Sequence, residues 1–180
     1  MGKDEELMLR VKRGDHDAFA HLYHRNKARL VHFCTTLLRN EDDAIDVCQE
    51  TFRYVHLNSA TYEPRARVST YLFHIARNKC IDILRKKKRW NLQPLDEAAD
   101  FGETPPESVM ESEELQLEIR KALDEIPDPF REVLLLRVME GMEYGEISRV
   151  VEAPLGTVKS RIHVGLERLR QVVRRKKVIE

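Results

Sequence analysis

The stretch GMEYGEISRVVEAPLGTVKSRIHVGLERLR, residues 141–170, decides the fold of the C-terminal part of the chain. Its first part has a short apolar face made by Ile147 and Val150 or Val151. Glu152 and Ala153 follow as a turn, and Pro154 suits the first turn of a second helix, where its missing N–H is not needed. The pattern therefore predicts two helices joined by a tight turn.

The second of these helices has two contrasting faces. The apolar face is made by Val158, Ile162, Gly165, Leu166 and Leu169, and the opposite face by Ser160, His163, Val164, Glu167 and Gln171, flanked by Lys159 and Arg161. Short polar and basic side chains on the first turns of a second helix suit the DNA major groove. Residues 154–177 contain eight basic and one acidic residue, which attracts phosphate. A plain amphipathic helix with a solvated basic face is the simpler alternative, but it leaves the preceding helix and turn unexplained.

Charge is segregated along the chain of 180 residues, although 31 basic and 31 acidic residues give a formal net charge of zero. Residues 91–115 contain eight acidic residues, no basic residue, three prolines and a glycine. Such a segment repels itself and breaks regular structure, so it predicts an extended linker. We therefore expect an all-α protein with a domain at 1–90, an acidic flexible linker at 91–111 and a helix-turn-helix domain at 112–180.

Apolar residues recur at spacings of three and four on both sides of the linker, which is typical of helices. In the N-terminal domain we expect helices at 16–39, 41–55 and 68–89, the first capped by Asp15, with a loop at 58–67. In the C-terminal domain we expect helices at 113–126, 128–141, 144–151 and 154–176. The apolar side of the second helix is expected to hold Ala44, Ile45, Cys48, Phe52 and Val55, and that of the third Val68, Leu72, Ala76, Cys80 and Leu84.

Two polar surfaces stand out in the N-terminal domain. One is a carboxylate-rich cluster opposite the apolar side of its helix, with Asp42, Asp43, Asp46, Gln49 and Glu50. The other is a stripe at i, i+4 spacing, with His74, Asn78, Asp82 and Arg85 or Lys86, that leads into five successive basic residues at 85–89. Tyr62, Tyr71 and Phe73 are near this stripe, and aromatic and basic side chains together suit single-stranded or melted DNA. The alternative without a binding role is a solvated helix face whose aromatic residues belong to the core.

Several classes of protein are disfavoured by what the sequence lacks. No apolar run approaches the length of a membrane span, and residues 1–13 contain no apolar core of an export signal. Cys34, Cys48 and Cys80 have no metal-site or disulfide spacing, which favours buried thiols in a reducing compartment. We therefore expect a cytoplasmic protein without membrane insertion.

At these residues the chain resembles bacterial sigma factors of the extracytoplasmic-function type. The resemblance is carried by DDAIDVCQETF (42–52), VSTYLFHIARNKCIDILRKKKR (68–89), EGMEYGEIS (140–148) and PLGTVKSRIH (154–163). It covers both predicted domains, about residues 5–90 and 112–172. It implies a transcription initiation factor that is not an enzyme and needs no metal or cofactor. The implied partners are core RNA polymerase, promoter DNA and an anti-sigma factor.

The resemblance also implies how the domains divide the work. The first domain of such proteins binds the clamp of the largest polymerase subunit and captures the minus-ten promoter element. The second binds the polymerase flap and the minus-thirty-five element, and the linker threads toward the active site and RNA exit channel. The acidity of the linker in this chain suggests that it mimics nucleic acid in a basic channel and is displaced by growing RNA.

Site residues follow by position. The resemblance implies that the polymerase clamp is contacted by Asp43, Asp46, Gln49 and Glu50. It implies that minus-ten DNA is contacted by Asn58, Tyr62, Arg65, Arg67, Tyr71, Asn78, Asp82 and Arg85. The loop at 58–67 would receive a flipped base. Minus-thirty-five DNA would be contacted by Thr157, Lys159, Ser160, Arg161, His163 and Val164.

Two positions depart from the pattern of these sigma factors. Glu152 stands in the turn where glycine is common, and a left-handed conformation there costs about 1 kcal/mol for a residue with a side chain. Val164 stands where arginine is frequent, so this chain lacks the charge of that phosphate or base contact. An apolar side chain at that position could instead touch a thymine methyl group.

Other functions fit only parts of the sequence. The DDxxD spacing of Asp42, Asp43 and Asp46 matches a weak Mg²⁺ motif of isoprenoid synthases, which also need a large apolar cavity. His21 and His24 could bind a metal with Cys34, but lone surface histidines are far commoner. A helix-turn-helix repressor that works without polymerase is the main alternative function. It leaves the carboxylate cluster and the acidic linker unexplained.

Overall fold

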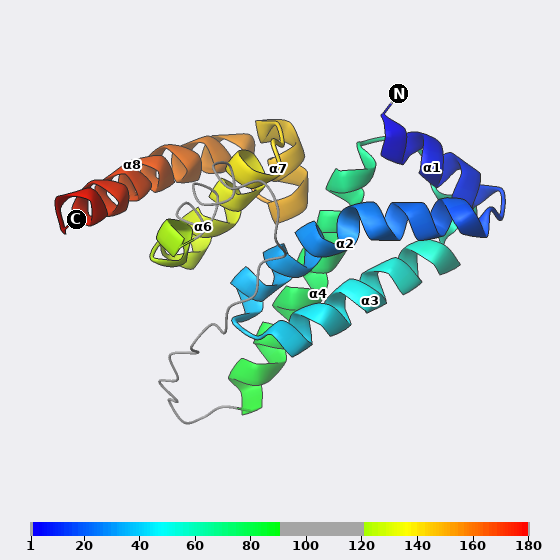
Figure 1. Cartoon of the computed structure of the whole chain (residues 1–180), viewed down its shortest axis with the longest axis horizontal. Helices are drawn as coiled ribbons and strands as arrows, with labels where there is room; N and C mark the ends of the chain where they lie inside the picture. Colours follow the sequence, from blue (N-terminus) through cyan, green and yellow to red (C-terminus); the bar gives the residue numbers. More distant parts are fainter. Residues whose placement is uncertain (1, 91–120, 180) are drawn as a thin grey trace. The chain divides into compact units, whose positions relative to one another are not determined.

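The computed structural model describes residues 2–90 and 121–179, and within these ranges it is helical, with no strand (Figure 1). The expected all-α class is confirmed. Contacts divide the chain into an N-terminal and a C-terminal unit, each described by itself below. The linker expected at 91–111 and the start of the helix expected at 113–126 lie outside the described residues.

The N-terminal unit contains α1 (Lys3–Lys12), α2 (His16–Leu38), α3 (Glu41–Leu57), the short 3₁₀ helix η1 (Ser59–Thr61) and α4 (Val68–Trp90). Two side-chain caps set the starts of its central helices. Asp15 accepts a hydrogen bond from the Ala18 amide, and Asn40 accepts one from the Asp43 amide, both at 2.9 Å. The three long helices begin where the sequence predicted them, and the loop at 58–67 contains one helical turn.

The core of this unit lies among α2, α3 and α4, where Phe33 packs edge-on against Phe73 with ring centroids 5.1 Å apart. Two expectations were wrong. On α3, Val47 is buried and Ile45 is only half-buried. The buried face runs along positions 44, 47, 48, 51, 52 and 55, and Ile45 lies at its edge. On α4, Leu84 is 37% exposed, because the exposed end of this helix begins there and continues through residues 85–89.

Helix α1 was not expected from the sequence, yet it completes the N-terminal unit. Its Leu7, Met8 and Val11 are buried. Glu5 accepts a hydrogen bond from the Val68 amide at 2.9 Å, which satisfies a free N–H at the start of α4. Lys12 donates to the Tyr62 carbonyl at 2.7 Å. Helix α1 thus holds the chain at Tyr62 and at Val68, before and after the last residues that lead into α4.

The C-terminal unit contains the helical residues 121–124, α6 (Asp128–Leu134), the π-helical segment η2 (Leu135–Met139), α7 (Tyr144–Val151) and α8 (Leu155–Ile179). A single helix was expected over 128–141, but its second half widens into a π helix. The Glu140 amide bonds to the Leu135 carbonyl, and Gly141, at φ 63°, then reverses the chain.

Helices α7 and α8 form the predicted helix-turn-helix (Figure 1). A capping box between Glu143 and Glu146 starts α7 at its predicted residue. Ser148 donates to the Ala153 carbonyl at 2.6 Å and ties the turn to α7. Helix α8 begins at Leu155, one residue later than expected, so Pro154 directly precedes the helix and is not its first residue.

Glu152 adopts the left-handed conformation considered from the sequence, with φ 50° and ψ 44°. Replacing Glu152 by glycine is expected to raise the free energy of unfolding of the C-terminal unit by about 1 kcal/mol, because glycine avoids the Cβ crowding of this conformation. Urea denaturation followed by circular dichroism measures the change. Glu152→Ala keeps the Cβ and is the matched control, and an equal gain in it would contradict the backbone explanation.

Gly165 sets the distance between α6 and α8. A Cβ atom at Gly165 would lie 2.9 Å from Leu134 Cδ1 and 3.3 Å from Phe130 Cβ. Replacing Gly165 by alanine is expected to lower the free energy of unfolding by about 1–3 kcal/mol, because buried Leu134 has no room to move away.

Gly156 provides the matched control on the same helix. A Cβ atom there meets nothing within 4 Å, so Gly156→Ala is expected to stabilise α8 by about 1 kcal/mol. Thermal unfolding of the two variants compares them directly. Equal effects would show that the approach of α6 does not set the cost at Gly165.

Candidate polymerase and nucleic-acid interfaces

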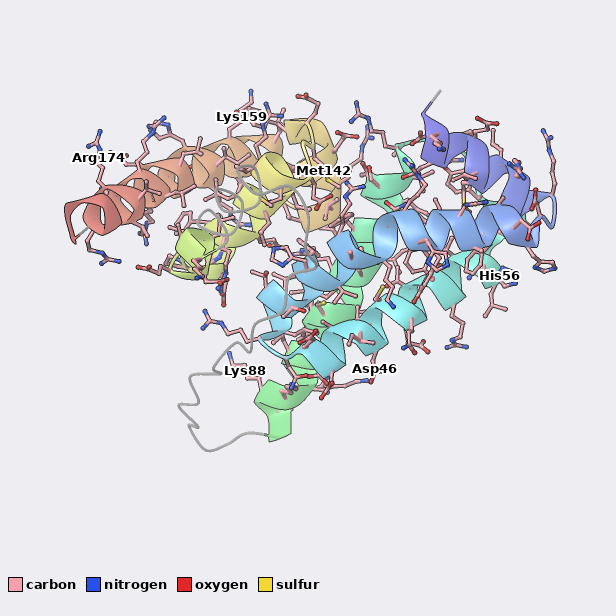
Figure 2. All side chains as sticks on the ribbon, in the orientation of Figure 1. Asp46, His56, Lys88, Met142, Lys159 and Arg174 are labelled. Carbon is pink, nitrogen blue, oxygen red and sulfur yellow. The ribbon has the colours of Figure 1, made fainter. Side chains whose placement is uncertain are left out.

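The carboxylate-rich face of α3 combines paired and exposed groups. Asp46, labelled in Figure 2, and Gln49 are exposed. Asp43 is paired with Lys87 of α4, with Oδ2 and Nζ 2.5 Å apart. Glu50 is paired with Arg53 at 2.8 Å and has Lys79 Nζ at 3.9 Å.

The hydrogen bonds from Arg53 hold the pKa of Glu50 below its ordinary value, and Lys79 adds to the effect. Glu50 is therefore a carboxylate at neutral pH. Asp43, Asp46, Gln49 and Glu50 form a negatively charged stripe along α3. Asp46 and Gln49 are exposed, and Glu50, although paired with Arg53, keeps 48% of its side chain exposed.

The loop at 58–67 is built on local hydrogen bonds. Asn58 Nδ2 donates to the Tyr54 carbonyl at 2.8 Å, and Thr61 Oγ1 donates to the Asn58 carbonyl at 2.9 Å. Arg65 is 85% exposed and pairs with Glu63. Arg67 is also exposed. The loop therefore presents basic side chains around a backbone that is locally fixed.

The aromatic residues near this loop are less open than the sequence suggested. Tyr62 is 6% exposed and Phe73 is in the core, because α1 and α2 cover them. Burial raises the pKa of Tyr62 and of Tyr71 above their ordinary values. The Tyr71 ring is half-buried, 5.6 Å from that of Tyr62. Of the three aromatics, Tyr71 alone retains appreciable exposure for stacking on a base.

The polar stripe of α4 runs from His74 to its basic end. Asn78 Nδ2 lies 3.3 Å from His74 Nε2, and Asp82 pairs with Arg85 at 3.8 Å. All five basic residues at 85–89 are exposed, including Lys88, labelled in Figure 2. This end of α4 is the most concentrated positive charge of the N-terminal unit.

The residues of α8 that are expected at minus-thirty-five DNA differ in exposure. Lys159, Ser160 and His163 are exposed, whereas Thr157, Arg161 and Val164 are half-buried. Beneath them, Val158 and Ile162 are buried. Lys159 and Arg174 lie near opposite ends of the helix (Figure 2). The first turns thus present polar and basic groups on a fixed apolar base.

Further along α8, two arginines serve the unit itself. The Arg168 guanidinium lies 4.7 Å from the centre of the Phe130 ring, and Arg175 pairs with Glu125. These contacts tie α8 to α6 and to Glu125, which lies just before α6. Neither role was expected from the sequence, because partners so distant along the chain leave no periodic signal.

The residues considered for metal binding are not brought together. Among the described residues no three His, Cys, Asp or Glu side chains converge on a possible ion, neither the three aspartates of the DDxxD spacing nor His21, His24 and Cys34. Cys34, Cys48 and Cys80 are free and buried. Burial raises the pKa of Cys48 to about 11, so it is a thiol at neutral pH.

Comparison with known proteins gives a consistent result for both units. Residues 22–90 match the family model "Sigma-70 region 2", and residues 116–169 match "Sigma-70, region 4". The chain is 34% identical to the ECF RNA polymerase sigma factor SigW of Bacillus subtilis, over 94% of this chain and 98% of that protein. It is 32% identical to the ECF RNA polymerase sigma factor SigE of Mycolicibacterium smegmatis, over 83% of this chain and 59% of that protein.

Solved structures share the fold. CnrH, solved in complex with the cytosolic domain of CnrY, superposes with a TM-score of 0.67 at 22% identity, covering 96% of this chain and 97% of that chain. The sigma factor RpoE of Bartonella quintana, solved with the anti-sigma factor NepR, gives 0.66 at 22% identity, covering 84% and 95%. Within the described residues, no helix combines the length and apolar character that crossing a membrane requires.

Proposed function

The chain belongs to the extracytoplasmic-function (ECF) sigma factors of RNA polymerase, and we propose that its two units divide promoter recognition between them. As a member of this family it binds core RNA polymerase and directs promoter recognition and transcription initiation. In our proposal residues 1–90 bind the polymerase clamp and the minus-ten element, and residues 112–180 bind the minus-thirty-five element. Residues 91–111 link them. The observation that carries this division is that each unit exposes a polar surface of its own, the α3 stripe in the first and the first turns of α8 in the second.

The polymerase contact is assigned to the α3 stripe. Asp46 and Gln49 are exposed on a helix whose other face is anchored in the core by Ala44, Cys48 and Phe52. A rigid helix that presents charge without reorganisation loses little entropy on binding. A negative stripe also selects a cationic partner surface and speeds its encounter. We assign Asp43 and Glu50 to the edges of the same contact.

Minus-ten recognition is assigned to the 58–67 loop and the polar stripe of α4. Asn58, Arg65 and Arg67 would contact the DNA from the loop, and Asn78, Asp82 and Arg85 from the helix. The bases would stack on Tyr71, because its ring is more open than that of Tyr62. Tyr62 would then support the loop from beneath.

Minus-thirty-five recognition is assigned to α8. Ser160, His163 and Val164 would lie toward the base edges, with Lys159 and Arg161 on either side and Thr157 at the start. The geometry is that of a recognition helix whose N-terminal turns enter the major groove. We further propose that the protein has no catalytic activity of its own and works in the cytoplasm with polymerase. An anti-sigma factor would regulate it, as NepR is bound to RpoE.

Site-specific photocrosslinking in the complex of polymerase, chain and promoter tests this division. A photoreactive amino acid at Gln49 is expected to label the largest polymerase subunit, one at Arg67 the minus-ten DNA, and one at Ser160 the minus-thirty-five DNA. Labelling of DNA from Gln49, or of minus-ten DNA from Ser160, would contradict the assignments. A repressor that works without polymerase would give no polymerase label at any position.

A further inference from the structure

An ion pair between Asp43 of α3 and Lys87 of α4 joins the two functional faces of the N-terminal unit. Lys87 Nζ donates to Asp43 Oδ2 at 2.5 Å, between two helices that pack against each other. Asp43 lies in the first turn of α3, at the edge of the polymerase-binding stripe. Lys87 lies at the centre of the basic run at 85–89, at the DNA-binding end of α4. Each residue therefore neutralises a charge that the other face uses.

The pair is accessible enough to change partners. The side chains of Asp43 and Lys87 are 33% and 47% exposed. The Asp43 amide is held by Asn40 Oδ1 at 2.9 Å, so the backbone keeps its place whichever cation the carboxylate meets. Lys87 has a long flexible stem, and its neighbours in the basic run are exposed.

The second contact between these faces differs in kind. Lys79 Nζ is 3.9 Å from Glu50, while Arg53 on the same helix as Glu50 is 2.8 Å away. Glu50 keeps a cation from its own helix even if Lys79 leaves. The link between polymerase binding and DNA binding therefore lies at Asp43 and Lys87.

We propose that the Asp43–Lys87 ion pair is exchanged when the initiation complex assembles, Asp43 pairing with a cation of the polymerase and Lys87 with a phosphate of the minus-ten DNA. The inference rests on the proposed functions of α3 and α4. In the free chain the pair lowers the affinity for both partners, and binding of either partner releases the group that the other needs. Such coupling is reciprocal. Because exposed ion pairs are weak, the effect on each affinity is about two- to fivefold.

The sign of one substitution tests the exchange. The affinity of the full chain for core polymerase is measured without DNA, for the wild type, Lys87→Gln and the control Lys3→Gln. Lys3 is an exposed lysine on α1, a different helix from the two that carry the ion pair. Lys87→Gln is expected to tighten polymerase binding about two- to fivefold, because Asp43 is released. Lys3→Gln is expected to leave it unchanged. A weaker or unchanged affinity of Lys87→Gln would overturn the exchange.

The converse substitution gives an independent check. Asp43→Asn is expected to raise the affinity of the free chain for single-stranded minus-ten DNA about two- to fivefold, beyond any gain in the control Asp17→Asn. In the double variant the gain in polymerase affinity from Lys87→Gln should disappear. Persistence of that gain without Asp43 would overturn the proposal.

A third variant separates failure of this inference from failure of its premise. If Asp46→Arg leaves polymerase affinity unchanged, α3 is not at the interface and the premise falls. If Asp46→Arg weakens polymerase binding but Lys87→Gln has no effect on it, the exchange alone is overturned.

Discussion

Replacing Asp46 by arginine is expected to weaken binding to core RNA polymerase about a hundredfold. Asp46 is an exposed member of the α3 stripe, and reversing its charge places like charges opposite each other in the contact, which costs several kcal/mol. Gln49→Ala removes only polar contacts and should cost less, up to about tenfold. Competition between the variants and a labelled wild-type chain for core polymerase measures both.

The control for this prediction is Asp17→Arg, which reverses an exposed aspartate on α2, outside the stripe. It should keep wild-type affinity for polymerase, and circular dichroism should show all three variants folded. Loss of transcription with unchanged polymerase affinity in Asp46→Arg would contradict the role of α3. Equal losses of polymerase affinity in Asp46→Arg and Asp17→Arg would show that the effect comes from the net charge of the chain and not from the position of Asp46.

Replacing Arg161 by alanine is expected to cost about 1–3 kcal/mol at the preferred minus-thirty-five sequence and to relax the preference there. Arg161 is half-buried on the second turn of α8, one residue before buried Ile162, so part of its side chain is covered and its freedom is reduced. A side chain held in this way at the recognition turns loses little entropy on contacting a base.

Arg174→Ala is the matched control, because it removes the same charge from the same helix. Arg174 is exposed 13 residues further along, a rise of about 20 Å, and lies beyond the reach of the same base pairs (Figure 2). If Arg174 contacts phosphate, Arg174→Ala should weaken binding to all sequences equally. It should also reduce the slope of log affinity against log salt concentration by about one. If Arg161→Ala weakened binding to all minus-thirty-five variants equally, Arg161 would not recognise a base.

The helix-turn-helix could be predicted closely because its signals are local. Apolar spacing, the turn at Glu152 and Ala153 and the position of Pro154 all act over a few residues. The left-handed conformation of Glu152 was considered because the sigma factors that the chain resembles often have glycine there, and it is confirmed. The caps of α2 and α3 are equally local, since Asp15 and Asn40 each bond three residues onward.

Tertiary packing could not be predicted in the same way. The burial of Tyr62 depends on α1, which was not expected, and a carboxylate from α1 also completes the start of α4. The exposure of Leu84 depends on packing against other helices, which apolar spacing along its own helix does not give. The pairing of Asp43 with Lys87 brings together residues 44 positions apart, so the sequence showed two opposite charge clusters without their contact.

The division of labour between the units is the central claim, and promoter-library transcription at saturating concentrations of the chain tests it most directly. With polymerase binding driven to completion, Asp46→Arg should recover the wild-type preference across all minus-thirty-five variants, because α3 does not read that element. Arg161→Ala should keep a relaxed preference at any concentration. A changed minus-thirty-five preference in Asp46→Arg, or a wild-type preference in Arg161→Ala, would contradict the account.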